Sequence, residues 1–347
     1  MLPGVSLVAK MPGMDYNHAM TWEILGHEWA TQMLREHVAK GRLRHAYLFT
    51  GPKGVGRRTL ALRLAQAINC PQPALPGQPC GICPTCKRIQ NMQHPDLAVV
   101  QAEQIGATLK VDQIRELQRS LSLAPYEARY RVALLLRFEE ANPNAANALL
   151  KTLEEPSSQV VLILTAESPE SLLPTIVSRC EVLRLSPLPL TAVSQGLQTG
   201  WNIPEEQARL LAHLSSGRPG YAVWLHQYPE LLEKRQALLD DHQNLLNSNR
   251  AARFAYSEKL TKDKEATRLA LQTWLSLWRD IMLRAARTSA PLTNLDRETE
   301  IENLASRIDL YSARCVISTI DKTLALLERN INTRLGVDVL LLDLPRL

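Results

Sequence analysis

Four of the six cysteines in this sequence lie within one short segment. They are Cys70, Cys80, Cys83 and Cys86. Each Cys-x2-Cys step can bring two thiolates onto one ion in a tight turn, and four thiolates complete the tetrahedral shell of Zn²⁺. The spacing predicts a structural zinc site with no open position for catalysis. An iron–sulfur cluster and four reduced cysteines are the alternatives, and His94 is more typical of a loop histidine than of a ligand.

A glycine-rich segment, Gly51–Thr59, follows an apolar run and precedes a helical pattern. Its glycines are Gly51, Gly54 and Gly56. A strand, a glycine loop and a helix in this order form the phosphate loop, in which backbone N–H groups cradle phosphates. Arg57 stands at its lysine position, Arg58 stands at its Mg²⁺-binding hydroxyl position, and Thr59 comes one residue too late. Because arginine offers no acceptor to a metal, we interpret the loop as vestigial and expect no bound ATP; binding without hydrolysis is the alternative.

An ATPase with such a loop also needs acidic residues at the end of a later strand, to hold Mg²⁺ and to activate water. The candidate strand is Val132–Leu136, but Arg137 and Phe138 follow it, and the acids arrive late as Glu139 and Glu140. In an extended chain this delay amounts to roughly 7 Å, too far for direct Mg²⁺ ligation unless the chain doubles back. We interpret both glutamates as part of a solvated turn.

A third candidate site consists of Ser178, Arg179 and Cys180. These residues follow a helix that we expect to begin at Ser168, and they precede an apolar run. A lone arginine at a helix C-terminus commonly complements the helix dipole. It can also act as an arginine finger, which reaches the γ-phosphate of a neighbouring subunit's ATP and stabilises charge in the transition state. The spacing alone leaves both interpretations open.

Strand and helix patterns alternate over residues 46–185. The apolar runs are Ala46–Thr50, Leu97–Val100, Val132–Leu136, Val160–Thr165 and Val182–Leu185. Short runs rich in valine, leucine and isoleucine are typical of strands buried on both faces of a parallel sheet. Helical periodicity between these runs predicts a three-layer α/β sandwich.

The strand signal ends near Pro187 and Pro189, after which the pattern is helical. We expect a disordered extension at residues 1–20 and an α/β domain at residues 21–186 with the zinc insert at residues 70–86. We expect a small helical domain at residues 187–228 and a larger all-α domain at residues 229–347.

The composition gives weaker indications. The chain has 347 residues with 45% hydrophobic residues and a formal net charge of +5, a mild basic excess that is compatible with nucleic acid but does not require it. There is no run of about 18 apolar residues, and the first residues make a poor signal peptide, so we expect a cytoplasmic protein without a membrane partner. Clustered cysteines in such a protein favour a metal over disulfides.

Several segments resemble bacterial clamp-loader subunits of the AAA+ family. The segment Asn144–Pro156 resembles the family's signature helix, and Pro174–Cys180 resembles its Ser-Arg-Cys motif. The four-cysteine insert resembles one shared by the delta-prime and gamma/tau subunits, and Ser215–Gly220 resembles the lid-domain element. The similarity runs from about His45 to Gly220, and the helical remainder fits the family's collar domain.

The resemblance implies an AAA+ α/β P-loop-type domain followed by a helical lid and an all-α collar. Motor subunits of the family keep intact phosphate-loop and acidic motifs, whereas this chain resembles the delta-prime class. The resemblance implies a non-hydrolysing subunit of the DNA polymerase III holoenzyme that supplies Arg179 in trans to a gamma/tau subunit. With the delta subunit, the assembly would place the sliding clamp on primed DNA. Thr165 matches a sensor position of the family, and Arg218 lies near a second one.

Two other functions stay open. One is an active clamp-loader ATPase that uses Arg57 in place of lysine, and hydrolysis by the isolated chain would identify it. The other is a zinc-containing DNA-repair adaptor on an inactive AAA+ scaffold, and tight DNA binding without clamp-loader partners would identify that. The sequence contains no nucleotidyl-transfer site, so a DNA-directed DNA polymerase activity would belong to the holoenzyme.

Overall fold

The computed structural model describes residues 22, 24–104, 106–329 and 332–346. The chain divides into two compact units. The first unit comprises the described residues up to Ala208 together with Gly217–Tyr221, and the second comprises Arg209–Ser216 and the described residues from Ala222 onward. The predicted extension at residues 1–20 lies outside the described residues. The predicted division into an α/β, a lid and a collar domain stays a prediction.

A five-stranded sheet forms the centre of the first unit, with the strand order β2-β3-β4-β1-β5. The strands are β1 (Ala46–Thr50), β2 (Leu97–Val100), β3 (Arg131–Leu135), β4 (Val160–Ala166) and β5 (Glu181–Arg184). Every neighbouring pair is parallel. All five predicted strands are therefore present, with their ends displaced by at most one residue. In a parallel sheet the carboxyl ends of the strands share one edge and the amino ends share the other.

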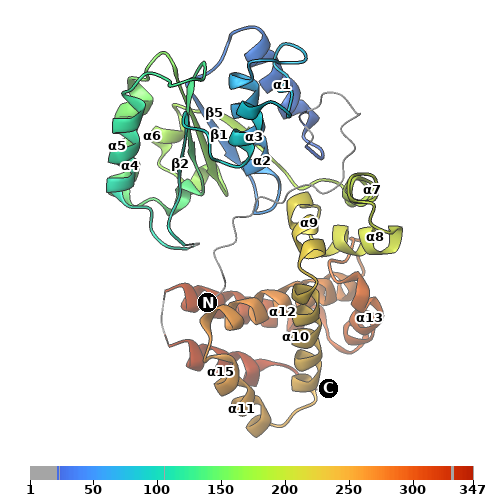
Figure 1. Ribbon diagram of the computed structural model, residues 1–347. Helices are drawn as coiled ribbons and strands as arrows, with labels where there is room; N and C mark the ends of the chain where they lie inside the picture. Colours follow the sequence, from blue (N-terminus) through green and yellow to red (C-terminus); the bar gives the residue numbers. More distant parts are fainter. Residues whose placement is uncertain (1–21, 23, 105, 330–331, 347) are drawn as a thin grey trace. The chain divides into compact units, whose positions relative to one another are not determined.

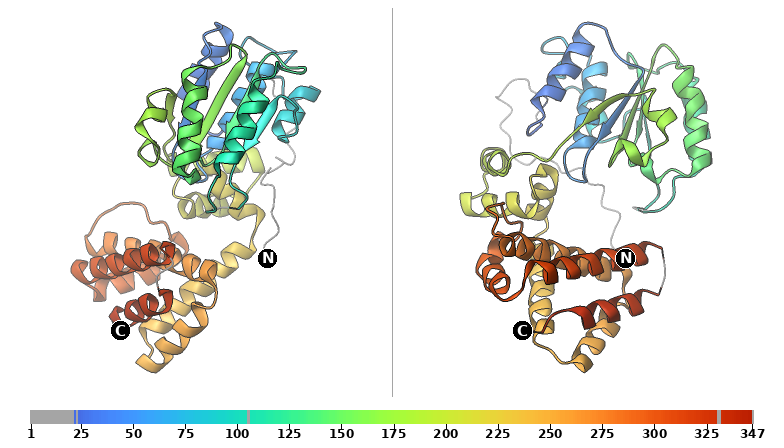
Figure 2. Two further views of the ribbon diagram at one scale, coloured as in Figure 1. Left: turned by 90° about the vertical axis from the view of Figure 1, so that its left-hand side faces the viewer. Right: turned by 180° about the vertical axis from the view of Figure 1, so that it is seen from behind.

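Helices connect the strands and cover both faces of the sheet. The helices before β3 are α1 (Glu28–Ala39), α2 (Arg57–Asn69), α3 (Pro84–Gln90) and α4 (Val111–Leu121). Those after β3 are η1 (Phe138–Glu140), α5 (Pro143–Glu154), η2 (Pro169–Ser171) and α6 (Pro174–Val177). Figure 1 shows α1, α2 and α3 on one side of the sheet and α4, α5 and α6 on the other, and Figure 2 shows the same layers from two further directions. This arrangement confirms the predicted three-layer α/β sandwich.

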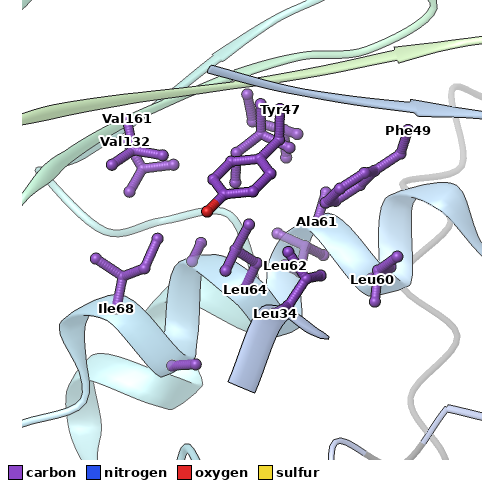
Figure 3. Close-up of a cluster of buried hydrophobic side chains, with 14 of the residues drawn as sticks. Leu34, Tyr47, Phe49, Leu60, Ala61, Leu62, Leu64, Ile68, Val132 and Val161 are labelled. Carbon is purple, nitrogen blue, oxygen red and sulfur yellow. The ribbon is translucent and has the colours of Figure 1, made fainter. Parts of the chain in front are cut away.

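Alternating side chains of each strand supply the two cores between these layers. Tyr47 and Phe49 of β1 point toward α1 and α2, where they pack with Leu34 and Leu64 (Figure 3). Leu48, between them, belongs to the opposite core with residues of α4 and α5. The period of two follows from strand geometry. Because both faces are covered, no position of β1 can be polar and exposed, which accounts for its continuous apolar run.

The helix predicted from Ser168 onward is interrupted. A short 3₁₀ turn, η2, is followed by Leu172 and Leu173 in extended conformations, and only then does the four-residue helix α6 begin. Leu173 precedes Pro174, and a residue before proline is sterically displaced from the helical region. The prediction of one continuous helix to Ser178 was therefore wrong.

The second unit is helical. After α7 (Leu190–Trp201), α8 (Glu205–Leu214) and α9 (Pro219–Gln227), the chain forms α10 (Glu230–Leu246), α11 (Arg250–Leu260), α12 (Lys264–Ala285), η3 (Leu295–Arg297), α13 (Glu298–Arg307), α14 (Leu310–Glu328) and α15 (Thr333–Asp343). Helix α12 packs against α10, α13 and α14 and buries Trp274 and Trp278. In the part of the chain that the structure describes, no helix has both the length and the apolar character needed to cross a membrane.

Candidate functional site

The four clustered cysteines come together in space. Cys70 ends α2, Cys83 caps the N-terminus of α3, and Cys86 lies within α3. All four sulfur atoms lie within 4.8 Å of one another, and Sγ of Cys80 is 3.5 Å from that of Cys70 and 3.9 Å from that of Cys86. Sulfurs at the corners of a tetrahedron with Zn–S bonds of about 2.3 Å are about 3.8 Å apart. The cluster can therefore hold a metal ion, and its dimensions fit zinc.

Backbone N–H groups point at the sulfurs of this cluster. The N–H groups of Cys80, Cys83 and Cys86 donate to the sulfurs of Cys70, Cys80 and Cys83, respectively, each at 3.4 Å. Burial acts to raise the pKa of the Cys80 thiol, but the N–H groups of Cys83 and Ile82 and the neighbouring thiols together lower it to about 7. Such donors stabilise thiolates, which are the form that binds metal.

His94 does not join the cysteine cluster. Its side chain is buried; Nδ1 accepts from the Asp96 N–H at 3.1 Å, and Nε2 lies 3.2 Å from a carboxylate oxygen of Glu127. Both ring nitrogens therefore face groups of the surrounding loops, which agrees with the interpretation of His94 as a loop histidine.

The glycine loop keeps a conformation that only glycine adopts easily. The φ angles of Gly51, Gly54 and Gly56 are 142°, 87° and 115°. A Cβ atom at Gly51 would lie 2.2 Å from the carbonyl oxygen of Leu185. Gly56 is the N-cap of α2, so the loop leads directly into a helix N-terminus, as a phosphate loop does.

The side chains at the lysine and hydroxyl positions of this loop are both arginines. Arg57 is buried, with 9% of its surface exposed, and burial lowers its pKa while the charge of Glu139 opposes that effect. Arg58 donates to the thioether sulfur of Met92 at 3.3 Å, and Thr59 is exposed. The backbone has the geometry of a phosphate loop, but two guanidinium groups stand where such a loop carries a lysine and a metal-binding hydroxyl.

The acidic residues after β3 are not in a solvated turn, so that interpretation was wrong. Arg137 adopts a left-handed conformation with φ 50° and ψ 56°, and the chain then turns through η1. One carboxylate oxygen of Glu139 and one of Glu140 are buried, and burial raises the pKa of Glu139. Glu140 Oε1 accepts from Arg137 Nε and from the Gly106 N–H, both at 3.0 Å. Glu140 thus links the turn after β3 to the loop that contains Gly106.

Thr165 and Arg218, which the resemblance associates with sensor positions, both contact backbone atoms. Thr165 Oγ1 accepts from the Arg137 N–H at 3.0 Å and is buried. The guanidinium of Arg218 lies 4.6 Å from the ring centre of Tyr221, and its Nη1 approaches the carbonyl oxygen of Lys53 at 3.5 Å. Arg218 therefore lies beside the glycine loop, while Thr165 holds the turn after β3; a sensor role for either residue stays a prediction.

Arg179 is held on the surface of the first unit by its own chain. Its Nη2 donates to Glu154 Oε1 at 2.7 Å, and its Nη1 donates to the carbonyl oxygen of Thr175 at 2.9 Å. About a third of the side chain stays exposed, 35%. The neighbouring Cys180 differs, since burial raises its thiol pKa to about 12, which disfavours the thiolate form. Ser178 donates to Thr175 through its hydroxyl at 3.2 Å.

Arg179 and the glycine loop lie at opposite edges of the sheet. In the parallel pairing of β1 with β5, Glu181 lies beside Tyr47, so Arg179 lies just before the amino ends of these strands. The glycine loop begins at Gly51, after the carboxyl end of β1. The two sites are about six residues apart along the strand direction, or roughly 20 Å. An arginine side chain cannot span that distance.

The reasoning from sequence missed Glu154 as the partner of Arg179. The sequence pattern that could have indicated this partner is an acidic residue at the end of α5, where the helix dipole disfavours negative charge. That signal indicates a compensating cation but does not identify which one.

Comparisons with known proteins agree with these features. A family model described as DNA polymerase III, delta subunit, matches residues 26–189. The chain is 34% identical over 254 residues to DNA polymerase III subunit delta' of Bacillus subtilis, a match that covers 72% of this chain and 75% of that protein. It is 37% identical over 228 residues to DNA polymerase III subunit delta' of Pseudomonas aeruginosa, covering 65% and 68%, respectively.

Two further similarities are to a tau subunit and to a gamma subunit-related protein. DNA polymerase III subunit tau of Escherichia coli is 33% identical over 192 residues, covering 52% of this chain and 29% of that protein. The crystal structure of a DNA polymerase III gamma subunit-related protein from Thermotoga maritima is 17% identical with a TM-score of 0.47, covering 91% of this chain and 97% of that one.

Proposed function

This chain belongs to the delta-prime family of DNA polymerase III subunits, and from this premise we propose that it supplies Arg179 to the ATP site of a neighbouring clamp-loader subunit while hydrolysing no ATP itself. The membership confirms the resemblance to clamp-loader subunits of the AAA+ class. The proposed role divides the chemistry between two chains, with the ATP on one and the stabilising cation on the other.

The position of Arg179 is the observation that carries this proposal. The side chain is exposed at the amino edge of the sheet, roughly 20 Å from the glycine loop of its own chain. It therefore cannot act on a nucleotide bound in that loop, and a phosphate of another subunit is the target that its position allows. A guanidinium suits that target, because its planar fork matches phosphate oxygens.

The side chains of the glycine loop support the proposal that this chain hydrolyses no ATP itself. Buried Arg57 occupies the lysine position, Arg58 offers no ligand to Mg²⁺, and Glu140 is already bound to Arg137 and Gly106. A chain with these side chains lacks the parts that position the metal and the water for hydrolysis. The alternative of an active ATPase using Arg57 is thereby disfavoured.

We infer that the cysteine cluster holds Zn²⁺ through Cys70, Cys80, Cys83 and Cys86. The bound ion would supply no reaction chemistry, because four thiolates leave no open position. The cysteines would tie the C-terminus of α2 to the N-terminus of α3 and so fix the insert.

The partners follow from the same proposal. We propose that gamma/tau and delta subunits surround this chain, that the helices of residues 229–347 form its part of the collar, and that the sliding clamp and primed DNA are met through the complex. The proposed location is the cytoplasm, at the replisome.

The test is ATP hydrolysis by the reconstituted complex of this chain with its gamma/tau and delta partners, clamp and primed DNA. Arg179→Ala in this chain alone should lower stimulated hydrolysis, and gel filtration should show an intact complex. For an arginine that stabilises transition-state charge, the effect on the site that it completes can reach 10³-fold or more. Hydrolysis by the remaining sites would set the residual rate.

Arg115→Ala is the matched control, since Arg115 is an exposed arginine that pairs with Asp112 on its own helix. It should leave hydrolysis unchanged. Equal rates for the two variants would reduce Arg179 to a helix-end charge. Hydrolysis of ATP by the isolated chain, abolished by Arg57→Ala, would contradict the proposal that this chain hydrolyses no ATP itself.

A further inference from the structure

We propose that Glu154 is a positioning residue for Arg179, and this inference rests on the function proposed above. Glu154 does not approach any phosphate itself. Its carboxylate holds the guanidinium of Arg179 in the orientation that a neighbouring subunit's ATP requires. The pair links α5, the helix that resembles the family's signature helix, to the turn after α6.

The contacts of the guanidinium show how it is oriented. Nη2 donates to Glu154 Oε1 at 2.7 Å, the length of a charge-assisted hydrogen bond. Nη1 donates to the carbonyl oxygen of Thr175 at 2.9 Å and approaches the hydroxyl of Ser178 at 3.4 Å. Contacts at both terminal nitrogens fix the plane of the group as well as its position. Thr175 and Ser178 are local to the turn, whereas Glu154 is the contact from a separate element.

These contacts leave part of the guanidinium available for a ligand. An arginine carries five N–H groups in a rigid fork, and the three contacts with Thr175, Ser178 and Glu154 engage three of them. The Nε–H and one hydrogen of Nη2 make no hydrogen bond among the described residues, so the guanidinium can still donate to phosphate oxygens.

The location of Glu154 argues against an incidental surface pair. Glu154 is the last residue of α5 and Glu155 is its C-cap, so two negative charges stand at the helix end where the dipole disfavours them. An acid that served only helix stability would be better placed in the first turn. At this end it is compensated by Arg179, which lies 25 residues further along the chain.

The first experiment uses the full-length chain alone and tests the contact without assuming its function. Phenylglyoxal modifies accessible arginines, and peptide mass spectrometry follows the rate at Arg179. Glu154→Ala should raise that rate about two- to fivefold, the range expected for loss of an exposed ion pair. Glu155→Ala is the matched control, because it removes the same charge from the same helix end at another exposed position, and it should leave the rate unchanged.

The second experiment measures ATP hydrolysis by the reconstituted complex. Glu154→Ala should lower kcat about two- to fivefold with the KM for ATP unchanged, because orientation of the finger affects the transition state rather than ATP binding. Glu154→Gln keeps an acceptor at the same place and should fall between Ala and wild type. In an Arg179→Ala background, Glu154→Ala should have no further effect, since the two residues act as one unit.

The outcomes separate this inference from the proposed function. If Arg179→Ala has no effect on hydrolysis, the proposed function fails, and the inference fails with it. If Arg179→Ala lowers hydrolysis but Glu154→Ala matches Glu155→Ala, the inference alone is overturned. A higher kcat for Glu154→Ala would also overturn it, because Glu154 would then be restraining the finger instead of orienting it.

Discussion

Replacing Arg253 should destabilise the helical unit strongly, because a single guanidinium there joins the ends of two helices. Arg253 is 2% exposed and lies in α11. Its three nitrogens donate at 2.7–3.4 Å to the backbone carbonyl oxygens of Leu245, Leu246, Leu341, Leu344 and Pro345. The first two belong to the C-terminal end of α10, and the others lie at or just after the end of α15. Carbonyls at these helix ends lack intrahelical partners.

The expected magnitude follows from these contacts. Arg253→Met keeps much of the apolar stem but leaves up to five carbonyl oxygens without their donor. Hydrogen bonds to charged groups contribute roughly 1.5–3 kcal/mol each but do not add when one side chain makes them all. Leaving a buried acceptor unsatisfied costs about 1–3 kcal/mol, and relaxation of the chain ends relieves some of the five carbonyls. We therefore expect the free energy of unfolding of this unit to fall by about 4 kcal/mol.

Urea unfolding followed by hydrogen exchange in peptides of α10, α12 and α15 reports on this unit separately from the α/β unit. With a slope of about 2 kcal/mol per M, a loss of about 4 kcal/mol lowers the midpoint by about 2 M. Arg250→Met is the control, because Arg250 is the exposed first residue of the same helix. A midpoint for Arg253→Met equal to that of the control would refute the argument that the buried guanidinium holds the helix ends.

Two further predictions concern the metal and the effect of acid. Metal analysis of the purified chain should give one zinc per chain, and Cys86→Ser should reduce that content and expose the insert to proteases. Cys315→Ser is the control and should leave the zinc content unchanged, because Cys315 is exposed and outside the cluster. The second prediction rests on His242, which is fully buried and accepts from Trp278 Nε1 at 2.9 Å; burial, followed by the charge of Arg253, lowers its pKa to about 3. Because the unfolded state binds the proton at higher pH than the folded state, His242 should make the unit lose stability as the pH falls from about 6.5 toward 3. In His242→Gln that part of the acid sensitivity should disappear, and equal acid profiles would contradict the assignment.

Much of the first unit could be predicted from local patterns. Five short apolar runs predicted five buried parallel strands, because a strand covered on both faces has no exposed position at which a polar residue is favoured. Four cysteines at short spacings predicted a metal site for a similar reason, since a Cys-x2-Cys turn brings its sulfurs together whatever surrounds it. Both inferences depend on residues that are near one another in the chain.

Predictions that depended on the backbone conformation of a turn were less successful. The helix expected from Ser168 is broken before Pro174, and the glutamates after β3 are partly buried because Arg137 takes a left-handed conformation. Arginine is not a residue that favours that conformation, so its sequence position gives no warning. The surrounding packing of the loops imposes it.

The sequence by itself determined the layers of the α/β unit, the cysteine cluster and the presence of Arg57 and Arg58 in the glycine loop, because each depends on residue type and short spacing. Only the tertiary structure decided what Arg179 can reach. The pairing of β1 with β5 places it at the opposite edge of the sheet from Gly51, and the end of α5 brings Glu154 against it. Both facts join residues far apart in the chain, and strand register and helix packing, not local preference, set such distances.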